Sequence, residues 1–336
     1  MTTLDFGKDK TAIIKGWAIL FMIILHCASP GNWDIPLREF ENTGLVHFMG
    51  TFKLCVGIFT FMVGYGYAFS KTKDLKYSLV HIRKLLIPFW VILFIFTLPV
   101  CYNQIGGGKI LLLNMVGVNS QLNWFSWFVA FYIYAMIVMP FVGRLIDRKP
   151  ILWSAVCIGI FFAGEIALHE LYPNYTENDW TQRLFDCLVQ SPCMVLGYLF
   201  ARKQWFTKVH LPQSKYMSLL AFMLIMGIFI VRNMKGAIIG FNLNFVYAPL
   251  FIFAALVIAN QLKCRFVSNV LTVLGNTSVY MWFFHALFFT ACTRWLYQPL
   301  VAISNSLWIV TLWTIVLTFV CSWCIMCVVN KIESKI

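Results

Sequence analysis

The sequence predicts an all-α membrane protein with about ten transmembrane helices packed in a single bundle domain, both termini lying in the cytoplasm. Composition is the first observation: 60% of the residues are hydrophobic and only 12% are charged, whereas soluble domains are about half apolar and a quarter charged. The second is that several segments run for about 18 residues or more with almost no charge, which indicates membrane helices rather than buried helices of a soluble core.

Ten apolar runs approach or exceed the length needed to cross a hydrocarbon core of about 30 Å. The expected spans are 11–29, 45–69, 85–102, 124–143, 151–169, 184–201, 216–231, 243–262, 268–292 and 306–329. Residues 105–118 are too short to cross and are expected to form a surface or re-entrant helix. Because no long linker or solenoid repeat interrupts the series, residues 1–336 are expected to form one transmembrane domain without an appended soluble domain.

The distribution of basic residues predicts the orientation. With the N-terminus in the cytoplasm, most of the 26 lysines and arginines fall in inner segments, and Lys53 falls within a span. The outer segments carry only Arg38, Lys109, Arg183, Arg232, Lys235 and Arg294. This bias supports two inner termini and an even number of spans. The net charge of +13 therefore reflects short inner loops beside membrane lipid, and no nucleic-acid partner is expected.

A polar stripe in the first span is the strongest indication of a functional site. Lys15 and His26 are eleven positions apart, about three turns, so both side chains lie on one face of an apolar helix. An ionisable residue inside a span costs about 3 kcal/mol or more, and it is therefore interpreted as functional. Neutral imidazole accepts a proton near neutral pH, which makes His26 a candidate general base. The alternative is a capping or interface histidine.

Basic residues before the third span form a second candidate group. Arg83 and Lys84 precede Pro88, which allows the helix to begin or kink there. They lie on the same predicted side as Lys15, where a cation would bind the phosphates of an anionic cosubstrate. Plain positive-inside bias is the alternative explanation. The sequence contains neither a P-loop nor a G-x-G-x-x-G motif, so a nucleotide would need a site of a different kind.

Further polar and aromatic residues fall in or beside the other predicted spans. His285 lies in the outward half of the ninth span. Trp124 and Ser126 begin the fourth span, where they either line a sugar site or belong to an interfacial aromatic belt. Lys53 and Glu165 lie within spans, where each needs a partner or a water-filled cavity, and they are candidates to pair with one another.

The cysteines do not form a disulfide framework, because the eleven are an odd number and most of them lie within spans. Cys321, Cys324 and Cys327 have a spacing similar to that of metal ligands. They lie in an apolar helix without a fourth ligand nearby, so packing residues are favoured over zinc and no metal is expected.

These features resemble the acyltransferase-3 family of integral membrane acyltransferases over nearly the whole chain. The pair Lys15 and His26 is similar to the family's first-helix motif, a basic residue followed by a histidine eleven positions later. FMVGYGY resembles the family's Phe-Phe-x-x-Ser-Gly-aromatic segment, with Gly66 at the glycine and Tyr65 in place of the serine.

Later segments continue the resemblance. RKLLIPFW is similar to the family's basic-x-x-x-Pro segment, and either Arg83 or Lys84 takes the place of its arginine. WFSWFVAFYIYAMIVMP resembles a fourth helix rich in Trp and Phe. LGNTSVYMWFFH resembles the late Gly-x-x-Ser-x-x-(Tyr or Phe)-x-x-x-His segment, with Tyr280 and His285 at its last two defined positions.

The resemblance implies an O-acyltransferase of the cytoplasmic membrane, expected in a bacterium. An acyl-CoA, usually acetyl-CoA, is the cosubstrate and arrives from the cytoplasm, and the acceptor is a hydroxyl of a cell-surface glycan or of a lipid-linked saccharide. In this scheme His26 is the general base, and the cations expected at the CoA phosphates are Lys15, Arg83 and Lys84. The residues expected near the acceptor are Trp124, Ser126, Tyr280 and His285.

A transporter or flippase of glycans or lipid-linked intermediates is the alternative function. Ionisable residues within the spans fit a transporter as well. Transporters often carry internal repeats and paired broken helices. The sequence shows no convincing repeat, which favours the enzyme.

Overall fold

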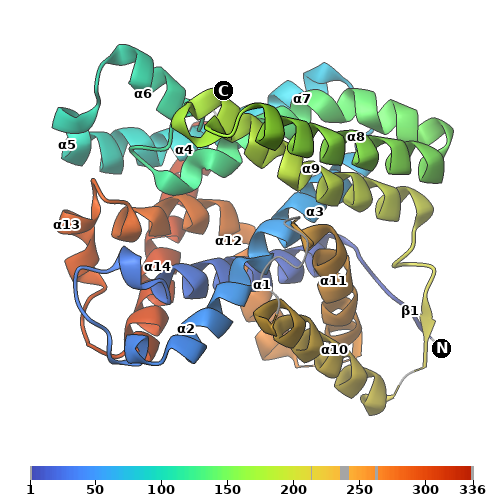
Figure 1. Ribbon diagram of the computed structural model, residues 1–336. Coiled ribbons are helices and arrows are strands. Elements are labelled where there is room, and N and C mark those ends of the chain that lie inside the picture. Colours follow the sequence, from blue (N-terminus) through green and yellow to red (C-terminus); the bar gives the residue numbers. More distant parts are fainter. Residues whose placement is uncertain (1, 213, 235–241, 262–263, 334–336) are drawn as a thin grey trace.

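The computed structural model describes residues 2–212, 214–234, 242–261 and 264–333 as an all-α bundle (Figure 1). Ten helical segments are long and apolar enough to cross a membrane, which confirms the predicted fold class. The helices that form them are α1 (Lys8–Cys27), α2 (Thr43–Gly50) with α3 (Leu54–Ala68), α4 (Leu75–Ile92) with α5 (Leu98–Cys101), α7 (Trp127–Arg148), α8 (Pro150–Leu171), α9 (Asp179–Lys203), α10 (Lys215–Met234), α11 (Asn244–Gln261), α12 (Arg265–Phe289) and α14 (Leu307–Glu333). Lys235, predicted as an outer cation, lies outside the described residues.

The third span begins earlier than the sequence analysis places it. Its apolar run starts at residue 85, but α4 starts at Leu75, because the Asp74 side chain accepts a hydrogen bond from the backbone N–H of Tyr77 at 2.8 Å. Pro88 therefore lies inside the helix, and the helix does not begin there. Arg83 and Lys84 consequently lie more than two turns into α4 instead of before it.

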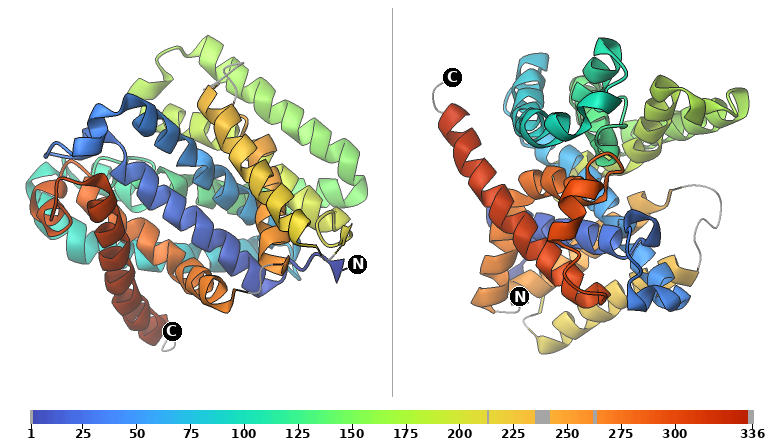
Figure 2. Two further views of the ribbon diagram at one scale, coloured as in Figure 1. Left: turned by 90° about the horizontal axis from the view of Figure 1, so that it is seen from below. Right: turned by 90° about the vertical axis from the view of Figure 1, so that its left-hand side faces the viewer.

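Helix α1 lies in the middle of the bundle, where it packs on α12 and also contacts α3, α11 and α14 (Figures 1 and 2). Gly275 allows the close approach of α12 to α1, because a Cβ atom there would overlap the carbonyl oxygen of Ala12. Gly64 has the same role between α3 and α9, where a Cβ atom would overlap the carbonyl oxygen of Met194. Two glycine contacts therefore position the helices that surround the site.

Three helices lie at the periphery of the bundle. The most apolar window of α12 is 67% buried, whereas the corresponding window of α10 is only 17% buried, and those of α8 and α14 are also mostly exposed. The exposed side chains are large and apolar, as Phe222 on α10 and Leu312 on α14 show. A surface of this kind is stable against lipid, and the chain is a multi-pass membrane protein.

The short elements lie outside the ten spans. Residues 105–118 contain α6 (Gly108–Met115), which is too short to cross, and the indole N–H of Trp90 donates to the carbonyl of Met115 at 2.8 Å to hold α6 against α4. Helix α13 (Arg294–Tyr297) lies between α12 and α14. Strand β1 (Thr2–Thr3) pairs with β2 (His210–Leu211) and so connects the N-terminal segment to the loop after α9.

Candidate active site

A cavity of about 1450 Å³ extends between the central helices. Typical ligand pockets occupy about 300–1,000 Å³, so this cavity has room for parts of two substrates at once. Its wall includes residues of α1, α3, α4, α7, α9, α11 and α12. Because consecutive spans run in opposite directions, the starts of α1 and α4 and the end of α3 lie on one side, which the basic residues predict to be the inner side.

Lys15 and His26 both line this cavity, and both side chains are partly buried. They lie about 16 Å apart along the continuous helix α1, from its rise of about 1.5 Å per residue. Lys15 lies towards the inner side and His26 in the outer half. The polar stripe that the sequence predicts therefore faces an internal space and not the lipid.

The outer end of α1 is fixed by hydrogen bonds to its terminal carbonyl groups. The side-chain amide of Asn32 donates to the carbonyl of His26 at 2.9 Å, and the indole N–H of Trp33 donates to that of Cys27 at 2.7 Å. Carbonyls at a helix end need such partners where water is absent. The loop that follows α1 therefore fixes the backbone from which His26 projects.

Two aromatic rings from distant segments contact the imidazole of His26. The ring centroid of Phe125, in the 3₁₀ turn Trp124–Ser126, lies 4.1 Å from that of His26. The ring centroid of His285, on α12, lies 5.4 Å from that of His26 and 5.2 Å from that of Phe125. Three elements that are far apart in sequence thus meet at the predicted general base.

His285 is fully buried, and its surroundings determine which ring nitrogen carries the proton. Its Nδ1 lies 3.1 Å from the carbonyl oxygen of Met281. A carbonyl only accepts, so Nδ1 is the donor and Nε2 of the neutral ring carries a lone pair. Nε2 has no hydrogen-bond partner among the described residues. A buried acceptor without a partner is uncommon in a folded protein and often has a functional role.

The inner part of the cavity wall contains aromatic residues that the sequence analysis did not name as site residues. Tyr67 at the end of α3 and Tyr77 at the start of α4 line it, with ring centroids 5.5 Å apart. His81 also lines it, and its ring stacks on Tyr77 at 3.9 Å. His81 was missed because it precedes the apolar run from residue 85. The signal that would have identified it is Asp74, a helix N-cap residue directly before α4.

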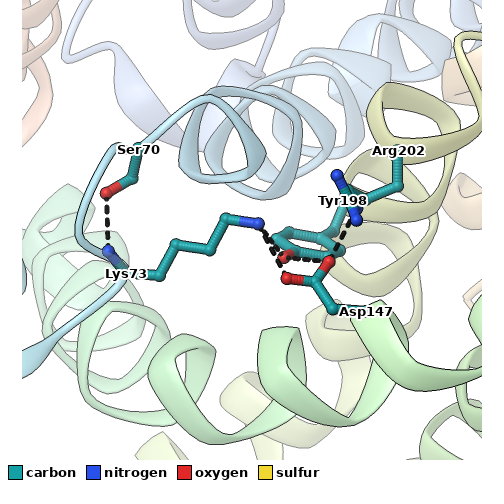
Figure 3. Close-up of polar contacts among 5 residues, drawn as sticks. All are labelled: Ser70, Lys73, Asp147, Tyr198 and Arg202. Carbon is teal, nitrogen blue, oxygen red and sulfur yellow. Dashed lines mark hydrogen bonds and ion pairs between the residues drawn. The ribbon is translucent and has the colours of Figure 1, made fainter.

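A polar network holds the loop between α3 and α4 in place (Figure 3). Asp147 on α7 accepts from Lys73 at 2.8 Å and from the hydroxyl of Tyr198 at 2.9 Å, and it also pairs with Arg202 at 2.6 Å. The hydroxyl of Ser70 accepts from the backbone N–H of Lys73 at 3.1 Å. Because this loop leads into the first turn of α4, the network positions the helix that carries Tyr77 and His81.

The other predicted site residues fall into two groups. Trp124 lines the cavity and is 59% exposed, and Ser278 of the late motif also lines it. Ser126 is fully buried beside Phe125, and Tyr280 is partly buried on α12, but neither is among the residues that line the cavity.

The cations of the third span lie apart from the cavity. Arg83 and Lys84 are exposed on α4, and neither is among the described residues that line the cavity. Of the three cations that the sequence analysis assigns to CoA phosphates, Lys15 is the one in the cavity wall.

The structure also places the remaining residues that the sequence analysis names within the spans. Lys53 lines the cavity, whereas Glu165 is buried on α8 with its Oε2 unpartnered among the described residues, so the two do not form an ion pair. Gly66, at the position of the family glycine, is exposed and lines the cavity. Tyr65, at the position of the family serine, packs instead on Phe6, with ring centroids 4.4 Å apart.

Within the described part of the chain, no group of three or more His, Cys, Asp or Glu side chains has an arrangement that could hold a metal ion.

The family model Acyl_transf_3, described as an acyltransferase domain, matches residues 12–327, nearly the whole chain. No curated protein and no solved structure matches it.

Proposed function

Since the chain belongs to the acyltransferase-3 family and is a membrane acyltransferase, we propose that it transfers an acyl group, preferentially acetyl, from acyl-CoA to a hydroxyl of a cell-surface glycan or its lipid-linked precursor. The observation that supports this most strongly is that His26 lines one cavity together with Lys15 towards the inner side and Trp124 towards the outer side. A donor from one side and an acceptor from the other would meet at this imidazole.

In this proposal His26 acts as the general base. Its neutral ring accepts the proton of the acceptor hydroxyl while the oxygen attacks the thioester carbonyl. The tetrahedral intermediate then collapses, the carbon–sulfur bond breaks, and the CoA thiolate takes the proton back from the imidazolium. The products are the acylated acceptor and free CoA. Lys15 lies about 16 Å from His26 towards the N-terminal end of α1, from the rise of about 1.5 Å per residue. There it would pair with a phosphate of CoA.

The position of His26 suits this role. The fixed end of α1 holds the backbone, and Phe125 packs against one side of the ring at 4.1 Å. Orientation of a base by packing is an effective way to lower the entropic part of the barrier. The half-buried ring remains in contact with the cavity, so a hydroxyl has access to it.

The test uses the purified full chain in lipid nanodiscs with acetyl-CoA and surface glycans extracted from a strain that lacks the gene. We expect CoA thiol release that depends on the glycan, together with a gain of one acetyl mass on the glycan. The matched control is heat-denatured protein. A transport assay in proteoliposomes tests the alternative function of a transporter or flippase. Glycan that crosses the membrane without CoA release would identify a transporter and reject the enzyme.

A further inference from the structure

Three cations from three segments lie in the outer half of the cavity. Lys53 follows α2, Arg183 lies at the start of α9 and Arg232 lies near the end of α10, and all three line the cavity. Among the described residues that line the cavity, Asp186 is the one acidic side chain. We call Lys53, Arg183 and Arg232 the outer basic cluster. With Asp186 included, the formal charge of this group is +2, from three cations and one carboxylate.

Arg183 is held rigidly and still has hydrogen-bonding capacity. Its side chain pairs with Asp186 at 2.7 Å, one turn further along α9. The residue is only 7% exposed, and its Nε has no partner among the described residues. Gln190, a further turn along the same face, is also 7% exposed and leaves its Oε1 unpartnered within the described chain. A buried guanidinium nitrogen on a cavity wall is positioned to bind a ligand atom.

Arg232 is held by contacts with three other residues. Its Nε donates to the carbonyl of Thr51 at 3.1 Å, and its NH1 group donates to the side-chain oxygen of Asn244 at 2.8 Å. The guanidinium also lies over the ring of Tyr247, 5.2 Å from its centroid. These contacts neutralise no charge, because both hydrogen-bond acceptors are neutral oxygens and the aromatic ring carries no net charge.

Lys53 adds a third positive charge without an acidic partner. It is exposed to the cavity and makes no ion pair with any residue that the structure describes. Its charge acts on both Asp186 and His26, so Lys53 is near the acidic residue of this wall and near the predicted base. Uncompensated charge within the span of a membrane is costly, and an anion in the cavity would balance it.

We propose that the outer half of the cavity binds an acceptor that carries an anionic group, a carboxylate or a phosphate, between Lys53, Arg183 and Arg232. Planar guanidinium groups match both anions geometrically, and a lysine adds a mobile point charge. The acceptor hydroxyl would then lie towards His26. This inference rests on the proposed function for the identity of the ligand as acceptor, but the anion site itself depends only on the cluster.

The first experiment measures binding and needs no turnover. The purified full chain in nanodiscs of neutral lipid is titrated at low ionic strength with methyl glucuronide, with glucose 1-phosphate and with methyl glucoside as the neutral probe. We expect one of the charged probes to bind about tenfold or more tightly than the neutral one. Preference for glucuronide would indicate an acidic sugar, and preference for glucose 1-phosphate would indicate a phosphate-bearing precursor. Equal affinity for all three probes would overturn the proposal.

Variants of Lys53 test the cluster without disturbing an ion pair. We expect Lys53→Gln to reduce the charged-to-neutral affinity ratio several-fold and Lys53→Glu to abolish it. The matched control is Lys109→Gln, which removes an exposed cation of α6 and should leave the ratio unchanged. An unchanged ratio in both Lys53 variants would overturn the assignment.

A competition experiment distinguishes acceptor from donor. The preference for the charged probe should persist with saturating CoA, whereas its loss would show that the cluster binds CoA phosphates and would overturn the acceptor assignment. Acetyl transfer is measured separately. Charged-probe preference without any acetyl transfer would count against the proposed function while leaving the anion site in place.

Discussion

The imidazole rings of His26 and His285 face one another across the contact between α1 and α12, with centroids 5.4 Å apart and ring planes 31° apart. The residues are far apart in the chain, and the close packing of the two helices at Gly275 brings them together. One ring lines the cavity, and the other is buried behind it. The pair combines an accessible base with a buried neighbour whose Nε2 is unpartnered among the described residues.

Replacement of His26 by alanine should remove the general base. We expect His26→Ala to lower the rate of acyl transfer about 10²- to 10⁴-fold, the usual contribution of a positioned proton acceptor. The measurement is CoA release by purified protein, with protein amount checked on the same sample. His169→Ala is the matched control, because His169 is exposed at the end of α8, and it should keep full activity. Full activity in His26→Ala would exclude the proposed base.

His285 should affect the rate of acyl transfer through its contact with His26. In His285→Phe the ring packing against Phe125 is kept, but the buried lone pair of Nε2 is lost. We expect kcat to fall about tenfold to a hundredfold, with the KM for acyl-CoA unchanged. The thermal midpoint should change little, because the variant removes the unpartnered Nε2 but also loses the Nδ1–H that donates to the carbonyl of Met281. A purely structural histidine would show the reverse, a lower midpoint with unchanged kcat.

Lys15 should contribute to donor affinity. Because Lys15 is the sequence-predicted phosphate contact that lines the cavity, we expect Lys15→Ala to raise the KM for acetyl-CoA about tenfold, the loss of one charge-assisted hydrogen bond. Affinity for the acceptor should remain unchanged. Lys76→Ala removes an exposed inner cation at the start of α4 and serves as the control. Equal KM values for both variants would remove Lys15 from the donor site.

Gly275 should be sensitive to the addition of a single methyl group. In Gly275→Ala the methyl meets the backbone carbonyl of Ala12, which has no flexible side chain to yield, so α1 and α12 must separate. We expect a loss of stability of about 1–3 kcal/mol, as for other overpacked sites. Gly159→Ala in α8, where the new Cβ meets nothing within 4 Å, should instead stabilise the helix. Thermal unfolding of both variants in one detergent is the measurement, and equal shifts would contradict the packing argument.

Glu39 should make the stability of the outer surface depend on pH. Its carboxylate accepts from the hydroxyl of Ser306 at 2.9 Å and from the backbone N–H of Leu307 at 2.7 Å, at the start of α14. Burial by itself raises the pKa of Glu39, but these hydrogen bonds together outweigh burial and bring the pKa below its ordinary value. The stabilisation is therefore present above the unfolded-state pKa of about 4.3 and is lost as pH falls through the lower folded value.

We accordingly expect Glu39→Gln to lower the thermal midpoint at neutral pH, with the difference from the wild type disappearing as pH falls below about 4. Glu41→Gln, which alters an exposed neighbour in the same loop, should leave the midpoint unchanged at every pH. A difference for Glu39→Gln that persists under strongly acidic conditions would contradict the assignment.

The spans were predictable because each must present a long apolar stretch to lipid, and such a stretch is visible in a short window of the sequence. The start of α4 was not predictable in this way, because its first turns are amphipathic and its boundary depends on the N-cap at Asp74. His81 was missed because it lies in these first turns. The proposed pairing of Lys53 with Glu165 was wrong, because α8 lies at the periphery while Lys53 faces the cavity.

The sequence by itself determined the ten spans and the common face of Lys15 and His26, because both follow from helix periodicity and the thickness of a membrane. Only the tertiary structure decided what surrounds that face. Phe125 and His285 contact His26, and the three cations of the outer basic cluster line the same cavity. Both arrangements depend on the choice of helices that pack together and on the glycines at which they approach closely. Neighbour choice depends on side-chain fit between distant segments, and no local pattern in the chain records it.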